Sequence, residues 1–298
     1  MPDGTTEGAP NAASLAELAN ALSELLRLRT LPIGMKLFRD AETMEQVQGL
    51  RRPSPGKRFS TCQLVTQARL AGFTLGITHD NVPEFSNCGG VIGLNAPSEL
   101  YLSGRKMEGV WFENLEASAA HQAQMPRVAP EYHGLVISPL RSARLDPPDI
   151  CLFYANPAQM ILFINGLQWR NYQRYDFSIT GESACADSWG RALRDRTVCL
   201  SLPCYAERRY GGVADDEMLI ALPPAELARA VTGLRGLSKA GLRYPIMPYG
   251  PQADPAEGMG KSYANRAGCV EAESPKTLNP ALSNGETMKV SASERIMV

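Results

Sequence analysis

The first half of the chain contains Ser60-Thr-Cys62-Gln-Leu-Val-Thr-Gln-Ala68, with a cysteine in its third position. The second half contains a stretch of the same outline, Ser183-Ala-Cys185-Ala-Asp187-Ser-Trp-Gly-Arg-Ala192. This repetition is the main indication of the fold. An extended apolar run precedes each stretch, and a second cysteine follows it: Cys88 in the first half and Cys204 in the second. Cys62 and Cys185 are separated along the chain by nearly the same number of residues as Cys88 and Cys204. The pattern predicts two related halves with four thiols near a pseudo-two-fold axis.

The order of apolar runs and helical patterns in both halves predicts an α/β (α+β) protein. We expect two pseudo-symmetric halves of mixed sheet with packed helices, forming one body. Residues 1–13 are predicted to be a disordered N-terminus, and 14–145 to be the first half with a helical linker segment. Residues 146–250 are predicted to be the second half, and 251–298, rich in Pro, Gly, Ala and Ser, an irregular tail.

Composition narrows the classes of function. A net charge of −1 and a pI near 6.3 provide no electrostatic footprint for nucleic acid or for an anionic membrane surface. No apolar run is long enough to span a membrane, and the N-terminus lacks the basic and apolar regions of a signal peptide, so we expect a cytoplasmic protein. Seven cysteines in a reducing compartment favour metal binding over disulfides.

The local sequence around each thiol predicts its setting. Ser60 and Ser183 are candidate helix caps, so Cys62 and Cys185 are expected at helix N-termini, where the helix dipole favours thiolate. Cys88 precedes two glycines and Cys204 follows a proline, and both are expected in loops. Backbone N–H groups in such loops can approach sulfur closely, as anionic metal–sulfur centres need.

With these motifs in place, the chain resembles the uncharacterised family called domain of unknown function 169, whose members carry four recurring cysteines. The matching stretches cover roughly residues 30–250: Phe59-Ser-Thr-Cys62-Gln-Leu-Val-Thr-Gln-Ala-Arg69, Asn87-Cys88-Gly-Gly, Ser138-Pro-Leu140, Pro148-Asp149, Asn156-Pro-Ala-Gln-Met160, Cys185-Ala-Asp187, Ser201-Leu-Pro-Cys204-Tyr-Ala-Glu-Arg208, Asp215-Asp-Glu-Met218, Arg243-Tyr-Pro245 and Pro248-Tyr-Gly250. The chain departs from the family at Pro203 and Ala206, where glycine is typical. The resemblance does not imply an activity.

The four repeated cysteines are interpreted as ligands of a [4Fe-4S] cluster, one thiolate for each iron. Widely separated thiols without a close Cys-x-x-Cys pair suit a cube better than a zinc ion, which is the second option. Two further alternatives remain open. The cysteines could be buried as small apolar side chains, which fits Cys151 and Cys199 in apolar runs, or one thiol could be a nucleophile with a histidine as its base.

Three residues are candidates for catalysis. Asp187 lies two residues after Cys185, and its carboxyl group could transfer a proton beside a metal centre. His79 lies between a predicted strand and Cys88 and could be a base or a substitute ligand. Tyr205, next to Cys204, could donate a hydrogen bond or a proton. The alternative for each is structural: a first-turn acid, a surface histidine and a packed ring.

Three other residues are candidates for substrate binding. Arg208 follows the last cysteine and Arg69 lies near the first, so either could bind a substrate carboxylate through two hydrogen bonds. Trp169 belongs to an aromatic group that could line a pocket for an organic molecule, although core packing is the commoner use of such a group. No nucleotide-binding motif is present in the sequence.

Together these features predict an iron–sulfur enzyme that acts on a small organic substrate, and an aromatic substrate is left open. A lyase or hydro-lyase that uses the cluster as a Lewis acid is favoured, with Cys88 or Cys204 as a displaceable ligand. The alternatives are a cluster-dependent reductase with an external electron donor and a non-catalytic metal-binding sensor or scaffold. A small-molecule substrate is the expected partner, homo-oligomer formation is left open, and nucleic acid and membranes are not expected.

Overall fold

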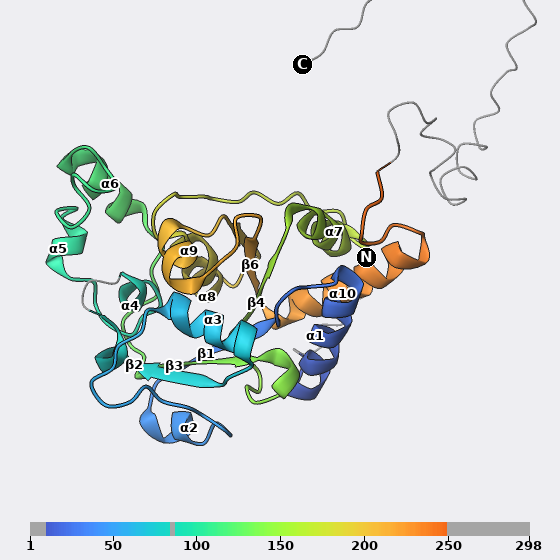
Figure 1. Cartoon of the computed structure of the whole chain (residues 1–298), viewed down its shortest axis with the longest axis horizontal. Coiled ribbons are helices and arrows are strands. Elements are labelled where there is room, and N and C mark those ends of the chain that lie inside the picture. The colour runs from blue at the N-terminus through green and yellow to red at the C-terminus, as the bar shows by residue number, and fades with distance from the viewer. Residues whose placement is uncertain (1–9, 84–86, 249–298) are drawn as a thin grey trace, which may run out of the picture. The chain divides into compact units, whose positions relative to one another are not determined.

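A computed structural model describes residues 10–83 and 87–248 of the chain (Figure 1). Both predicted halves belong to one compact unit that ends at Pro248. The predicted tail at 251–298 and most of the predicted disordered N-terminus lie outside the described residues. The prediction for residues 12 and 13 is wrong, because helix α1 (Ala12–Leu26) begins there: the Asn11 side chain accepts a hydrogen bond from the backbone N–H of Ser14 and caps the helix.

The described residues contain one six-stranded sheet with the strand order β2-β3-β1-β4-β6-β5. Its strands are β1 (Ile33–Phe38), β2 (Leu75–Thr78), β3 (Gly134–Pro139), β4 (Ile150–Ala155), β5 (Cys199–Ser201) and β6 (Met218–Leu222). The α+β class is confirmed. The expectation of a mixed sheet is wrong in detail, because every strand pairing in the described part of the chain is antiparallel.

The strand order is symmetric about the pairing of β1 with β4. In the first half β1 is followed outward by β3 and then β2, and in the second half β4 is followed by β6 and then β5. Because β1 and β4 are antiparallel, with Gly34 opposite Cys151, a two-fold axis normal to the sheet relates the halves. The two pseudo-symmetric halves predicted from the cysteine pattern are therefore confirmed as one sheet.

Helices cover both faces of the sheet (Figure 1). Besides α1 they are α2 (Ala41–Glu45), α3 (Thr61–Ala71), α4 (Cys88–Val91), α5 (Glu99–Leu102), α6 (Leu115–Gln124), α7 (Pro157–Gln168), α8 (Arg191–Asp195), α9 (Tyr205–Gly211) and α10 (Pro224–Lys239), and a π-helical turn over Ala186–Gly190 leads into α8. Among the described helices, none is long and apolar enough to cross a membrane.

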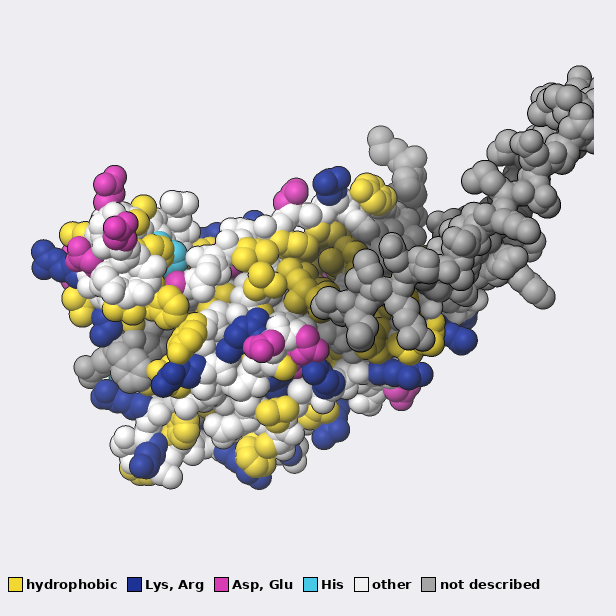
Figure 2. All heavy atoms as spheres, turned by 45° about the horizontal axis from the view of Figure 1, so that its top comes forward, with side chains coloured by type: hydrophobic (Ala, Val, Ile, Leu, Met, Phe, Trp, Pro, Cys, Tyr) yellow, Lys and Arg dark blue, Asp and Glu magenta, His cyan; other side chains and the backbone are white. Residues whose placement is uncertain are grey.

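Alternation along the strands divides the core in two. In β4, Ile150, Leu152 and Tyr154 face the cluster that includes α3, the π-turn and two of the repeated cysteines. Cys151 and Phe153 alternate with them along the strand and face the other cluster, which is built by α1, α7 and α10. The cysteine side of the sheet is therefore a separate layer from the three-helix side. Figure 2 shows hydrophobic side chains interspersed with charged ones on one face of the molecule.

Candidate functional site

The four repeated cysteines come together in the structure. Cys62, Cys88, Cys185 and Cys204 line a single cavity of about 400 Å³, which we call the cysteine pocket. Cys88 is half-buried and the other three are buried. The Cys88 thiol is hydrogen-bonded to the thiols of Cys62 and Cys185, so residues far apart in the sequence form one cluster of sulfur atoms.

Each thiol lies at the start of a helical segment. Cys62 is in the first turn of α3, which Ser60 and Gln63 cap reciprocally, and Cys185 directly precedes the π-turn. The expectation of a loop is wrong for Cys88, which is the first residue of the short helix α4. Cys204 is the N-cap of α9, at the junction of loop and helix. Each of the four thiols therefore lies in or next to the first turn of a helical segment at the pocket wall.

Burial opposes the thiolate form of these cysteines. It raises the pKa of the Cys204 thiol to about 11, although hydrogen bonds from the backbone of Glu207, Ala184 and Ala206 lower it. Hydrogen bonding to Cys88, followed by burial, raises the pKa of the Cys62 and Cys185 thiols well above the ordinary value. The raised pKa values favour the protonated thiols of Cys62, Cys185 and Cys204 in the protein alone, and metal coordination would have to release those protons.

The donor set was compared with two kinds of metal centre. One zinc ion draws its sulfur ligands to about 2.3 Å from a single point. Among the described residues, no group of three or more His, Cys, Asp or Glu is arranged to hold a metal ion. An iron–sulfur cube binds each thiolate through a different iron, so its sulfur ligands stand around a larger volume. Four thiols that line one cavity match the number of thiolates that such a cube takes.

Tyr205 is the predicted catalytic residue that lines the cysteine pocket. Its ring is half-exposed and meets Trp111 edge to face, with 5.6 Å between ring centroids. Arg209 Nη1 donates a hydrogen bond to the Tyr205 hydroxyl at 3.0 Å. The phenol is therefore held in place at the wall of the pocket.

The other two predicted catalytic residues do not line the pocket. Asp187 is buried in the π-turn and is hydrogen-bonded to Ser178 and Thr180; burial raises the pKa of its carboxyl, and these hydrogen bonds lower it. His79 is exposed, with its Nε2 3.0 Å from the Asp80 carboxylate. The sequence placed both close to a cysteine along the chain, but their side chains point to other neighbours.

The two predicted substrate-binding arginines are used within the fold. Arg69 is buried, and its Nη1 lies 3.0 and 3.1 Å from the two carboxylate oxygens of Glu217. Its guanidinium also stacks over the Tyr154 ring, 4.2 Å from the centroid. Arg208 donates to the carbonyl oxygens of Pro203 and Ala214. Neither arginine lines the cysteine pocket.

Trp169 lies on the opposite side of the sheet. It is the C-cap of α7, and its ring packs over Gly236 of α10 in the three-helix layer. The aromatic side chains that do line the cysteine pocket are Tyr101, Trp111, Tyr205 and Tyr210. The rings that line the pocket therefore do not include Trp169, and a pocket for an aromatic substrate stays a prediction.

Two glutamates next to the thiols, the buried Glu207 and the partly buried Glu182, were missed from the sequence. Glu207 accepts hydrogen bonds from the Tyr154 hydroxyl at 3.0 Å and from the Cys204 backbone N–H at 3.2 Å. The Cys-x-x-Glu spacing at 204–207 is that of a capping box and could have revealed it. Glu182 lines the pocket from an irregular segment that carries no such signal, and its Oε2 lies 3.8 Å from His121 Nε2.

Glu207 predicts a pH dependence of stability. Burial raises the pKa of its carboxyl from 4.5 to about 7. A raised folded-state pKa stabilises the protein fully below pH 4.5, and this contribution is lost as pH rises through 7. The unfolding free energy of the metal-free protein should therefore fall between pH 5 and 8. In urea unfolding, Glu207→Gln should make this fall smaller by about 3 kcal/mol. If the variant shows the same fall in unfolding free energy as the native protein, Glu207 is ionised in the folded protein.

The fold and the pocket define an α+β protein of two related halves that brings four cysteines to one cavity. The chain belongs to the DUF169 family, described as uncharacterised ArCR, whose sequence model matches residues 21–233. It is also similar to an uncharacterized protein of Methanocaldococcus jannaschii, with 25% identity over 226 residues that cover 74% of this chain and 93% of the relative. No solved structure matches the chain.

Proposed function

We propose that this protein is an enzyme that holds a [4Fe-4S] cluster through Cys62, Cys88, Cys185 and Cys204. The observation that carries the proposal is that these four thiols, contributed by four separate segments, line one pocket. Backbone hydrogen bonds to Cys204 are of the kind that stabilise metal-bound thiolate. When bound, such a cluster supplies either a Lewis-acidic iron or a single electron.

The walls of the pocket favour a reaction on a small organic molecule. Its volume of about 400 Å³ lies within the range of small-molecule sites, and four aromatic rings line it. Tyr205 would orient the substrate by a hydrogen bond from its hydroxyl group. Burial raises the pKa of the Glu182 carboxyl to about 7, so this group could hold or release a proton near neutral pH.

A lyase or hydro-lyase remains the favoured class of reaction. It requires one thiol to be displaceable, and Cys88 is the least buried of the four and lies in a helix of only four residues. Cys204 is the weaker candidate because Glu207 and backbone N–H groups hold it in place. We expect Cys88 to be the displaceable ligand in a protein that acts in the reducing cytoplasm.

A cluster-dependent reductase is the second candidate. The observation in its favour is that all four thiols reach the same pocket, which would saturate a four-iron cluster and leave electron transfer as its use. This enzyme would need an external electron donor. It would also need all four cysteines equally, whereas the lyase tolerates loss of Cys88.

The two reaction classes differ in a test that needs no substrate. Native protein and its Cys88→Ser and Cys204→Ser variants are reconstituted anaerobically with ferrous iron and sulfide, and dithionite is then added while absorption is followed. For a lyase we expect Cys88→Ser to retain most of the iron, Cys204→Ser to lose it, and dithionite to leave the native spectrum unchanged. Equal losses in both variants with reversible bleaching would support the reductase. Failure of the native chain to bind iron and sulfide would contradict both.

A further inference from the structure

A second, larger cavity adjoins the cysteine pocket. It has a volume of about 830 Å³, and we call it the outer chamber. The two cavities share lining residues from three parts of the chain: Ser60, Asn87, Tyr101, Lys106 and Tyr210. A ligand larger than the cysteine pocket could therefore extend past these shared residues into the outer chamber.

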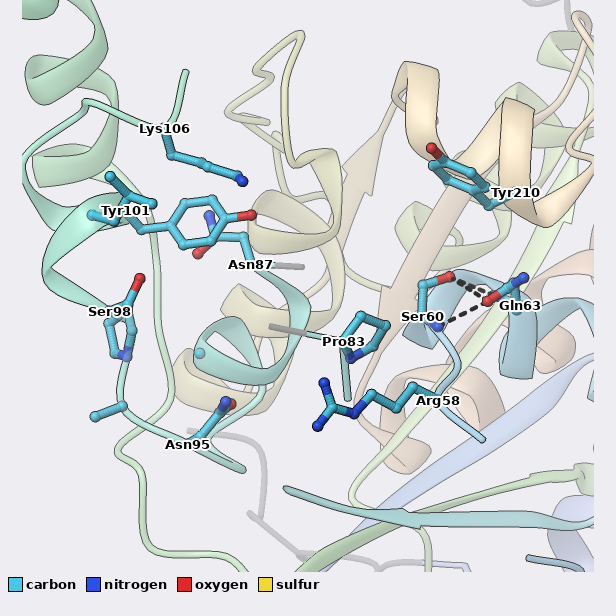
Figure 3. Close-up of a pocket in the computed structure, with 14 residues that line it drawn as sticks. Arg58, Ser60, Gln63, Pro83, Asn87, Asn95, Ser98, Tyr101, Lys106 and Tyr210 are labelled. Atoms are coloured by element: carbon cyan, nitrogen blue, oxygen red, sulfur yellow. Dashed lines mark hydrogen bonds between the residues drawn. The ribbon is translucent and has the colours of Figure 1, made fainter. Parts of the chain in front are cut away.

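The outer chamber is cationic. Arg58 and Lys106 line it, and among its described lining residues there is no aspartate or glutamate. Figure 3 shows the two side chains reaching toward the same space from opposite sides, with the Tyr101 ring beside Lys106. Two cations among the described lining residues favour an anionic group in this chamber.

The junction of the two cavities is polar. Asn87 is more than nine-tenths buried, and its Nδ2 donates to the Met125 sulfur at 3.0 Å. Its Oδ1 has no hydrogen-bond partner within the part of the chain that the structure describes. A buried carbonyl without a partner is unfavourable, and a hydroxyl or amino group of a ligand at this junction would satisfy it.

The cysteine pocket contrasts with this chamber, because aromatic rings dominate its walls. The Trp111 and Tyr205 rings of this pocket stand edge to face, and Tyr101 and Tyr210 line both cavities. Lys106 lines both cavities. The cysteine pocket thus offers aromatic walls to a planar body, with Glu182 as the carboxyl group among its described lining residues, and the outer chamber suits a negative charge.

We propose that the combined cavity binds an aromatic carboxylate, with its ring in the cysteine pocket and its carboxylate held by Lys106 at the entrance to the outer chamber. This names the class of substrate for the proposed function. The reaction on the carboxylate rests on that function, whereas its binding does not. A phosphate ester is disfavoured, because such groups are typically cradled by a run of backbone N–H groups in a glycine-rich loop. Lys106 thereby takes the role first assigned to Arg69 and Arg208.

Ligand-observed NMR on the purified full chain tests this directly. Benzoate, phenylacetate and cinnamate are each compared with benzamide, the neutral analogue of benzoate, and with inorganic phosphate. We expect at least one carboxylate to bind, with benzamide about tenfold weaker because it lacks the charge that pairs with lysine. Lys106→Gln should weaken carboxylate binding about tenfold. Arg105→Gln is the matched control, since Arg105 neighbours Lys106 in the chain but lines neither cavity.

Several outcomes would overturn the inference. Equal binding of benzamide, equal binding to the Lys106→Gln variant, binding of phosphate alone, or no binding of any of the three carboxylates would each contradict it. Slower alkylation of Cys88 by iodoacetamide when the carboxylate is present would locate the ring at the thiols, and an unchanged rate would place the ligand elsewhere. All these readouts use metal-free protein, so a failed cluster proposal and a failed carboxylate proposal are distinguishable.

Discussion

Cys62→Ser and Cys185→Ser are each expected to lose nearly all bound iron after anaerobic reconstitution. Both thiols are buried, and each is hydrogen-bonded to Cys88 within the pocket. A serine hydroxyl is a much poorer ligand for iron than a thiolate, and no other described Cys lines the pocket to replace it. Iron and acid-labile sulfide per chain, measured beside the absorption spectrum, give the result.

The chain supplies two matched controls for these variants. Cys151 in β4 and Cys199 in β5 are also buried, but they do not line the cysteine pocket. Cys151→Ser and Cys199→Ser should therefore retain the iron of the native protein. Each replaces one buried sulfur atom by oxygen, as Cys62→Ser and Cys185→Ser do. Equal iron loss in all four variants would mean that the losses reflect damage to the fold, and the four-thiol assignment would fail.

Glu217→Ala is expected to destabilise the folded protein by about 3–5 kcal/mol. The Glu217 carboxylate is buried, contacts Arg69 through both oxygens, and also accepts the backbone N–H of Ala214 at 3.0 Å. Without it, the Arg69 guanidinium would remain buried with no opposite charge beside it. Urea unfolding of the metal-free protein measures the effect as a lower unfolding midpoint.

The neighbouring residue provides the control for this prediction. Asp216 pairs with Arg29 at 2.7 Å, but both side chains are about half-exposed, so Asp216→Ala should cost under about 1 kcal/mol. A double change of Arg69→Met with Glu217→Ala should be more stable than Glu217→Ala alone, because it removes the uncompensated charge. A loss for Glu217→Ala no larger than that for Asp216→Ala would show that water reaches Arg69.

The architecture could be predicted because the chain repeats itself. Apolar strands and cysteines recur in the same order, and the sheet obeys the same symmetry about β1 and β4. The convergence of the four thiols followed from that symmetry. Sequence could not show that α4 begins at Cys88, because two glycines in succession normally disfavour a helix and tertiary packing decides the outcome.

The polar residues of the site were predicted less well. Arg69 lies seven residues from Cys62, but its partner Glu217 is distant in the chain, and only the folded structure shows that the two neutralise each other. Lys106 lies in a segment without periodicity, so nothing in the sequence singled it out. Closeness along the chain predicts a shared site only where the element between two residues directs both side chains to the same face.

Iron and sulfide analysis of the native full chain, purified without exposure to oxygen, tests the central claim most directly. The account predicts a brown protein with about four irons and four sulfides per chain, since four thiols line one pocket. A colourless protein that contains no iron, and that takes up none on anaerobic reconstitution, would contradict the claim. The pocket would then have to be explained as a site of thiol chemistry without a cluster.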